Sequence, residues 1–118
     1  MIDAVDLTNL RTITGGDAAV EHELFSIFLE SSAECLTALQ NNKHAAGSDE
    51  WRRQAHAFKG ISHALGAMLL GDLCRDAQHC PPENLDEKAR LAEAITIEHA
   101  RVVLFVKDML AAMPAAQA

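Results

Sequence analysis

Three residues whose types could serve a chemical reaction interrupt a helical stretch, which reads "HAFKGISHALGA" at residues 56–67. His56, Lys59 and Gly60 stand where alanine or leucine would build a more stable helix. Imidazole is a nucleophile, and a lysine ammonium three residues away can reach an anion attached to the ring. Gly60 lies four residues after His56, on the same helical face, and leaves that side open. This spacing suits a phosphoryl group carried on His56.

A helical wheel divides the segment into an apolar arc and a polar arc. The apolar arc contains Trp51, Ala55, Phe58, Ser62 and Leu65, with Ala57, Ile61 and Ala64 beside them. The polar arc contains Asp49, Arg52, Arg53, His56, Lys59, Gly60 and His63. The wheel therefore predicts that His56 faces solvent and is not a packed core histidine. A solvent-facing histidine taken singly often has no function, so the argument depends on its two companions.

A helical hairpin predicts a partner for His56. If two antiparallel helices turn near residue 67, His56 and Gln78 lie equally far from the turn and therefore level with each other. A glutamine carbonyl there can accept the proton on one imidazole nitrogen and leave the other nitrogen free as the nucleophile. The alternative for Gln78 is a solvated surface amide without a role.

The elements that position these residues are predicted to be helices. Ala and Leu dominate the chain and aromatic residues make up only 4% of it, which favours helix over strand. Helix breakers occur at Gly15-Gly16, at the loop 41–48, at Gly66 or Ala67, and at Pro81-Pro82. Short loops make consecutive helices antiparallel neighbours. We expect an all-α fold, an antiparallel four-helix bundle with a short extra N-terminal helix.

Helix ends and core faces follow from residue type. The expected N-caps are Asp3, Asp17, and Ser48 or Asp49. The fourth helix should end near Cys80, and the fifth should run from near Asn84 to about Met113. The second helix should bury Val20, Leu24, Ile27, Phe28, Ser31, Cys35 and Leu39. The fifth should bury Leu91, Ala94 or Ile95, Glu98 or His99, Val102, Phe105 or Val106, and Met109. Residues 1–118 should form a single domain with residues 114–118 frayed.

Composition excludes several classes of protein. With 17 acidic and 10 basic residues, the net charge of -7 argues against a general nucleic-acid binder. No apolar run is long enough to span a membrane, and the N-terminus does not resemble a signal peptide. The three cysteines, Cys35, Cys74 and Cys80, form no C-x-x-C pair and suit a reducing compartment. We therefore expect a cytoplasmic protein.

The central stretch resembles the signature of histidine-containing phosphotransfer (HPt) domains, roughly His-x-(Leu/Phe)-Lys-Gly-x-(Ser/Ala)-x-x-(Leu/Ile)-Gly-(Ala/Met). Every specified position is filled, by His56, Phe58, Lys59, Gly60, Ser62, Leu65, Gly66 and Ala67. The similarity extends over about residues 3–80, while the last helix matches only in pattern. A motif filled throughout in this helical context is strongly specific.

The resemblance implies a phosphocarrier of two-component signal transduction. His56 would accept a phosphoryl group from an aspartate of one receiver domain and pass it to an aspartate of another. Lys59 would lie near the phosphate, Gly60 would leave room for the partner, and Gln78 would bond the imidazole. The partners implied are receiver domains of hybrid histidine kinases and response regulators, docked through a basic rim. That rim would contain Arg52, Arg53, Lys59 and Arg75.

The chain lacks the other parts of a phosphotransfer enzyme. It has no phosphate-cradling Gly-rich loop, no nucleotide-binding motif and no acidic triad for Mg²⁺. We therefore expect a phosphotransfer intermediate that is not a kinase and has no cofactor of its own. The resemblance implies that the receiver domain supplies Mg²⁺. A monomer is the simplest expectation.

Two alternatives remain open. A metal site could draw on ligand types at His56, His63, Cys74, His79 and Cys80. Their spacing matches no structural zinc pattern, and the Glu-x-x-His motif of di-iron bundles is absent from the sequence. A docking adaptor without phosphotransfer is the second alternative, which the presence of the histidine and its companions disfavours.

Overall fold

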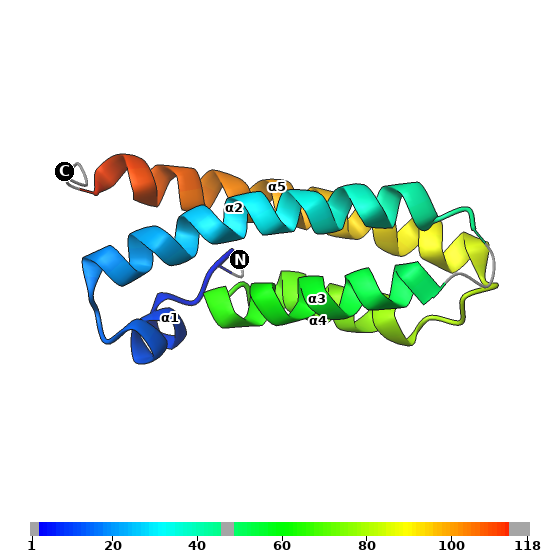
Figure 1. The fold of residues 1–118 in the computed structure, drawn as a ribbon, viewed down its shortest axis with the longest axis horizontal. Helices are drawn as coiled ribbons and strands as arrows, with labels where there is room; N and C mark the ends of the chain where they lie inside the picture. Colours follow the sequence, from blue (N-terminus) through cyan, green and yellow to red (C-terminus); the bar gives the residue numbers. More distant parts are fainter. Residues whose placement is uncertain (1–2, 46–48, 114–118) are drawn as a thin grey trace.

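Four long helices form an antiparallel bundle, and a short fifth helix precedes them (Figure 1). The structure is a computed structural model that describes residues 3–45 and 49–113. Its helices are α1 (Leu7–Thr14), α2 (Ala18–Asn42), α3 (Asp49–Leu65), α4 (Met68–His79) and α5 (Leu85–Ala112). No described residue belongs to a strand. The predicted fold, a four-helix bundle with a short N-terminal helix, is confirmed.

The bundle has two layers, one of α2 and α5 and the other of α3 and α4 (Figure 1). Each of the four long helices packs on its neighbour in sequence, α5 closes the ring against α2, and α1 contacts α3. Because α2 and α5 are longer than α3 and α4, they extend beyond the second layer at one end, where α1 fills the space. None of the helices that the structure describes is long and apolar enough to cross a membrane.

The core consists of aromatic and aliphatic side chains from all four long helices. Its largest members, Trp51, Phe25, Phe28 and Phe58, are at most 2% exposed. Complete burial of an apolar side chain of this size contributes about 1.5–3 kcal/mol. Two of these aromatic residues come from α3, so the same helix that presents His56 to solvent is held firmly by its opposite face.

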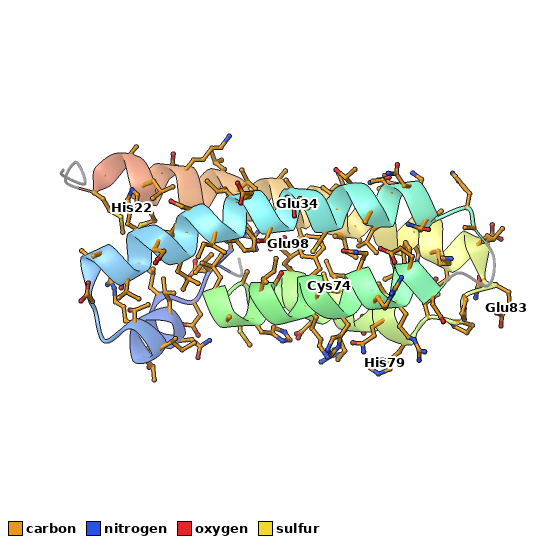
Figure 2. All side chains as sticks on the ribbon, in the orientation of Figure 1. His22, Glu34, Cys74, His79, Glu83 and Glu98 are labelled. Carbon is orange, nitrogen blue, oxygen red and sulfur yellow. The ribbon has the colours of Figure 1, made fainter. Side chains whose placement is uncertain are left out.

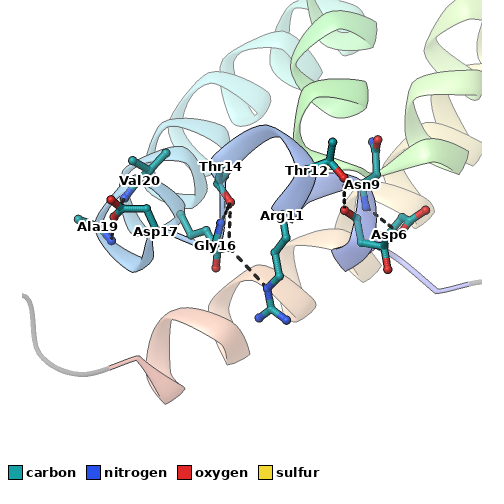
Figure 3. Close-up of polar contacts among 11 residues, drawn as sticks. Asp6, Asn9, Arg11, Thr12, Thr14, Gly16, Asp17, Ala19 and Val20 are labelled. Atoms are coloured by element: carbon teal, nitrogen blue, oxygen red, sulfur yellow. Dashed lines mark hydrogen bonds and ion pairs between the residues drawn. The ribbon is translucent and has the colours of Figure 1, made fainter.

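The N-terminal segment differs from the prediction at its helix cap. Asp6 caps α1 by accepting a hydrogen bond from the Asn9 backbone N–H at 3.1 Å (Figure 3). The prediction that Asp3 caps this helix is wrong. Ala4 and Val5 are buried in the core but lie in bends of the backbone, and the helix begins only after Asp6.

The start of α2 confirms one prediction and corrects another. Asp17 is the N-cap, and its carboxylate accepts from the N–H groups of Ala19 and Val20. The predicted burial of Val20 and Ile27 is wrong, since they are 48% and 52% exposed. The helix is rotated so that Glu21, Phe25 and Ser32 face the core beside Phe28, Cys35 and Leu39.

A polar contact with α1 explains this rotation. The Glu21 carboxylate is buried, accepts a hydrogen bond from the Thr14 hydroxyl at 3.0 Å, and lies 3.6 Å from Arg11 Nε (Figure 3). The spacing of apolar residues along α2 does not predict that Glu21 occupies a core position, because the partners that compensate its burial come from another helix.

The remaining helix boundaries lie close to the predicted ones. α2 continues through Asn42, past the predicted start of the loop at residue 41. Asp49 is the first residue of α3 and therefore not its N-cap, whereas the alternative cap, Ser48, lies outside the described residues. α5 is capped by Asn84, and Met113 follows its last residue. The predicted fraying of residues 114–118 also lies outside the described residues.

The core face of α5 resolves the alternatives that the sequence left open. Ile95, Glu98 and Val106 are buried, whereas Ala94, His99 and Phe105 are half-buried. Two buried residues of α5, Lys88 and Ala92, were not predicted at all.

His99 makes the stability of the bundle depend on pH. Its ring lies between α2 and α3, hydrogen-bonded to the Ser32 hydroxyl at 2.9 Å and edge-on to Phe58. Burial lowers the pKa of His99 below its ordinary value of 6.5. The folded state therefore favours the neutral ring, and the unfolded state binds the extra proton as the pH falls. The free energy of unfolding should decrease as the pH falls below about 6.5.

The His99→Gln variant should lose part of that dependence, because glutamine does not titrate. We expect a flatter profile of unfolding free energy between about pH 6.5 and pH 5, measured by urea denaturation. The control is His44→Gln, which removes an exposed histidine and should keep the slope of the wild type. Equal slopes for His99→Gln and the wild type would contradict this account.

Candidate functional site

His56 lies on the exposed face of α3. Trp51, Ala55, Phe58 and the later core residues of this helix point into the bundle, and the ring of His56 points away from it. The predicted exposure of His56 is confirmed. The ring is thus accessible to a second molecule while its backbone is fixed by the buried side of the same helix.

Gln78 on α4 lies beside the imidazole. Its side-chain nitrogen Nε2 is 3.1 Å from His56 Nδ1. The hairpin turns through Gly66, whose φ is +94°, a conformation that favours glycine. The predicted break and the predicted proximity of Gln78 to His56 are therefore confirmed.

The atom of Gln78 that faces the imidazole differs from the prediction. The amide nitrogen faces the ring, where the sequence argument placed the carbonyl oxygen. Gln78 Oε1 is buried and has no hydrogen-bond partner among the described residues. A half-turn of the amide exchanges the two atoms, so the tautomer of His56 depends on which of them faces Nδ1.

The two flanks of His56 have opposite character. A Cβ atom built on Gly60 would meet nothing within 4 Å, so this side of the ring is open. Lys59 is half-buried and makes no hydrogen bond or ion pair with any described residue. Its ammonium is therefore available to an anion near the ring.

The predicted basic rim is only partly free. Arg53 pairs with Glu50, and Arg75 lies 3.5 Å from Asp72 and 3.7 Å from Asp76. These exposed pairs contribute little stability, but they offset the positive charge that a docking partner would meet. Within the described residues, Arg52 and Lys59 have no acidic partner, so they carry most of the uncompensated charge of the rim.

A shallow pocket of about 400 Å³ lies beside Gln78, at the end of α4. It is lined by Asp49, Arg52, Gln78, His79, Cys80, Pro81 and Pro82. Arg52 precedes His56 by four residues and so lies on the same face of α3. The pocket therefore extends the exposed face of His56 toward the α4–α5 turn.

The histidines and cysteines that were considered as possible metal ligands do not converge on one site. Cys74 is buried among the helices, whereas His79 lies on the outer side of α4 (Figure 2). Burial raises the pKa of the Cys74 thiol far above its ordinary value, which disfavours the thiolate that a metal needs. His63 bonds Asp72 at 3.1 Å. The described residues hold no group of three or more His, Cys, Asp or Glu side chains arranged to bind a metal ion.

Comparisons with known proteins show the family and the fold of the chain. The family model described as the Hpt domain matches residues 23–116. The chain belongs to the Hpt domain family. This Hpt domain therefore functions as a phosphorelay phosphocarrier in two-component signalling, and domains of this family interact with receiver domains. A search of curated protein sequences found no match.

A solved structure shares the fold of this Hpt domain. It is the crystal structure of histidine-containing phosphotransfer protein B (HptB) from Pseudomonas aeruginosa PAO1. The TM-score is 0.87 at 24% sequence identity, and the match covers 97% of this chain and 100% of that one. The likeness extends over α1 and all four helices of the bundle, and the family model also includes the last helix, for which the sequence argument had found a match only in pattern.

The sequence argument missed one hydrogen bond and one buried residue near the site. Trp51 was placed on the apolar arc, yet its indole N–H also donates to the Ala77 carbonyl of α4. Lys88 is completely buried at the same end of the bundle. The only available signal was the single tryptophan of the chain, which stands near His56 in sequence.

Proposed function

We propose that His56 is the phosphoacceptor of this Hpt domain and carries the phosphoryl group between aspartates of two receiver domains. The observation that carries this proposal is the placement of His56 on an exposed helical face, with Gln78 at Nδ1 and the open side of Gly60 beside the ring. No described residue forms a hydrogen bond with His56 Nε2. This nitrogen is therefore the nucleophile.

The reaction is an in-line displacement at phosphorus. The lone pair of His56 Nε2 attacks the phosphorus of the aspartyl phosphate, the bond to the aspartate oxygen breaks, and the carboxylate leaves with the electron pair. The imidazole must carry its proton on Nδ1 for Nε2 to attack. Gln78 supports this tautomer when its amide is turned so that Oε1 accepts from Nδ1–H. That orientation also bonds the buried Oε1 atom.

Charge neutralisation is divided between the two proteins. Lys59 provides an ammonium beside the transferred group, and Arg52 adds positive charge on the same face of α3. The receiver domain supplies Mg²⁺ and the acidic pocket that holds it, since this chain requires no cofactor of its own. The carrier is therefore not a kinase, and the direction of transfer depends on which receiver domain docks.

The receiver domains belong to hybrid histidine kinases and response regulators, and the carrier docks on them as a monomer. All three cysteines are free, buried thiols, which suits a reducing, cytoplasmic location. A single domain covers residues 1–118. A docking adaptor without phosphotransfer would not need the imidazole and its Gln78 contact, so it is the weaker proposal.

Phosphotransfer from labelled receiver domains tests the proposal. A panel of receiver domains is phosphorylated with radiolabelled acetyl phosphate, freed of that reagent, and mixed with the purified chain. We expect label on the chain that survives base, is lost in acid and maps to the peptide containing His56. Label that is stable to acid, or that maps elsewhere, would contradict the assignment. Binding of receivers without any transfer would favour the adaptor.

The open side of His56 can be closed by Gly60→Gln. A long side chain there should obstruct the approach of the receiver domain, because the space beside Gly60 is empty in the free protein. We expect the transfer rate to fall about tenfold or more, a barrier increase of about 1.4 kcal/mol, with unchanged helical circular dichroism. Ala100→Gln, at an exposed alanine on α5 in the other layer, is the control and should transfer normally. Equal rates for both variants would show that the open side is not required.

A further inference from the structure

Trp51 joins the start of α3 to the end of α4. Its ring is 1% exposed, and its Nε1–H donates to the Ala77 carbonyl at 2.7 Å. The Ala77 carbonyl lies in the last turn of α4, where it accepts a long backbone hydrogen bond from the Cys80 N–H at 3.3 Å and a shorter one from the indole. Ala77 immediately precedes Gln78, whose amide contacts His56. The indole N–H therefore acts one residue away from the group that orients the imidazole.

Lys88 supports the indole from the other side. Its side chain is fully buried, and its ammonium lies 5.1 Å from the centroid of the Trp51 ring. It donates to the carbonyl of Ala45 at 2.9 Å and to that of Pro82 at 3.1 Å. A buried ammonium is costly unless it is hydrogen-bonded, and here two carbonyls and an aromatic face compensate it. This one cation thus ties the α2–α3 and α4–α5 connections to the indole.

The end of α4 depends on these contacts for its position. Pro81 and Pro82 stop the helix shortly after Gln78, so no further helical turn holds that residue in place. The backbone on the N-terminal side of Gln78 is bonded by Trp51, and Pro82 on the other side is bonded by Lys88. The backbone that carries Gln78 is therefore held on both sides by these two contacts.

We propose that Trp51 and Lys88 are positioning residues for phosphotransfer, which hold the last turn of α4 so that Gln78 stays at Nδ1 of His56. The inference rests on the proposed role of His56. It assigns to Trp51 a task beyond filling the core, because a phenylalanine ring would fill most of the same space. Of these two side chains, only the indole has an N–H that can donate to the Ala77 carbonyl.

The test is Trp51→Phe in the full chain, read first on the unphosphorylated protein. The ¹⁵N chemical shifts of the His56 ring give the populations of its two neutral tautomers. We expect the wild type to favour the Nδ1–H form, and Trp51→Phe to move toward the mixture seen in Gln78→Ala. Phe25→Leu is the control, a core change distant from the site that should lower stability and leave the His56 tautomers unchanged.

Transfer from a labelled receiver domain supplies the second measurement. Trp51→Phe should slow transfer severalfold in the wild-type background and should have no further effect in the Gln78→Ala background, because it acts through Gln78. Equal slowing in both backgrounds, or wild-type tautomer populations in Trp51→Phe, would overturn the proposal.

Lys88→Met covers the case in which Trp51→Phe does not fold. It keeps the length of the side chain and removes the ammonium, and we expect it to shift the His56 tautomers in the same direction. Unchanged tautomers in that variant would overturn the role of Lys88. The tautomer measurement needs no phosphotransfer, so it decides this proposal even if the labelled residue proves not to be His56.

Discussion

His56→Gln is expected to reduce base-stable phosphorylation of the chain to background. Glutamine has a similar polarity, yet its amide nitrogen has no available lone pair to attack phosphorus. The fold should be retained, because His56 is exposed and substitutions at such positions usually change stability by no more than about 0.5 kcal/mol. The measurement is the amount of label transferred from a phosphorylated receiver domain, with circular dichroism as the check on folding.

His79→Gln provides the matched control for this variant. His79 is another exposed histidine, on the outer side of the adjacent helix, and its Nδ1 is bonded to the Arg75 carbonyl. We expect it to retain label at the level of the wild type. Persistent base-stable label on His56→Gln, or its loss from His79→Gln alone, would transfer the phosphoacceptor role to another residue.

Gly66→Ala should produce the largest loss of stability among single-methyl changes in the HPt signature. Gly66 has a φ of +94°, where a residue with a Cβ is strained, and an added Cβ would lie 2.7 Å from the backbone oxygen of Asp6. The Asp6 N–H also donates to the Gly66 carbonyl at 2.7 Å, so the two backbones cannot separate without breaking that bond. We expect the free energy of unfolding to fall by roughly 2–4 kcal/mol, measured by urea denaturation.

Gly60→Ala, in the same HPt signature, should change the free energy of unfolding in the opposite direction from Gly66→Ala. The backbone of Gly60 is helical and a Cβ there would meet no atom within 4 Å, so the substitution should stabilise the bundle by about 0.5–1 kcal/mol. The two glycines would then differ in sign: one is required by the turn of the hairpin, and the other lowers stability while keeping a surface open. If Gly66→Ala were as stable as the wild type, the contact between the N-terminal segment and the hairpin turn would not be needed.

Local signals predicted most of the helices correctly. Pro81-Pro82, Gly15-Gly16 and Gly66 ended helices where the sequence indicated, because φ restrictions act within one or two residues. The phase of α3 was also correct, since Phe58 and Leu65 leave little choice of buried face. The rotation of α2 was not, because Glu21 is buried through Thr14 and Arg11 of another helix.

The sequence by itself determined the all-helical bundle, the exposed position of His56, the empty side at Gly60 and the level pairing with Gln78. These features depend on helical period and on the place of one turn, both of which are local properties of the chain. Tertiary structure alone decided which ring nitrogen of His56 the Gln78 amide contacts, that Glu21 is buried against Thr14, and that Lys88 lies buried over Trp51. Such contacts join different helices, and their partners are chosen by packing geometry that no local pattern encodes.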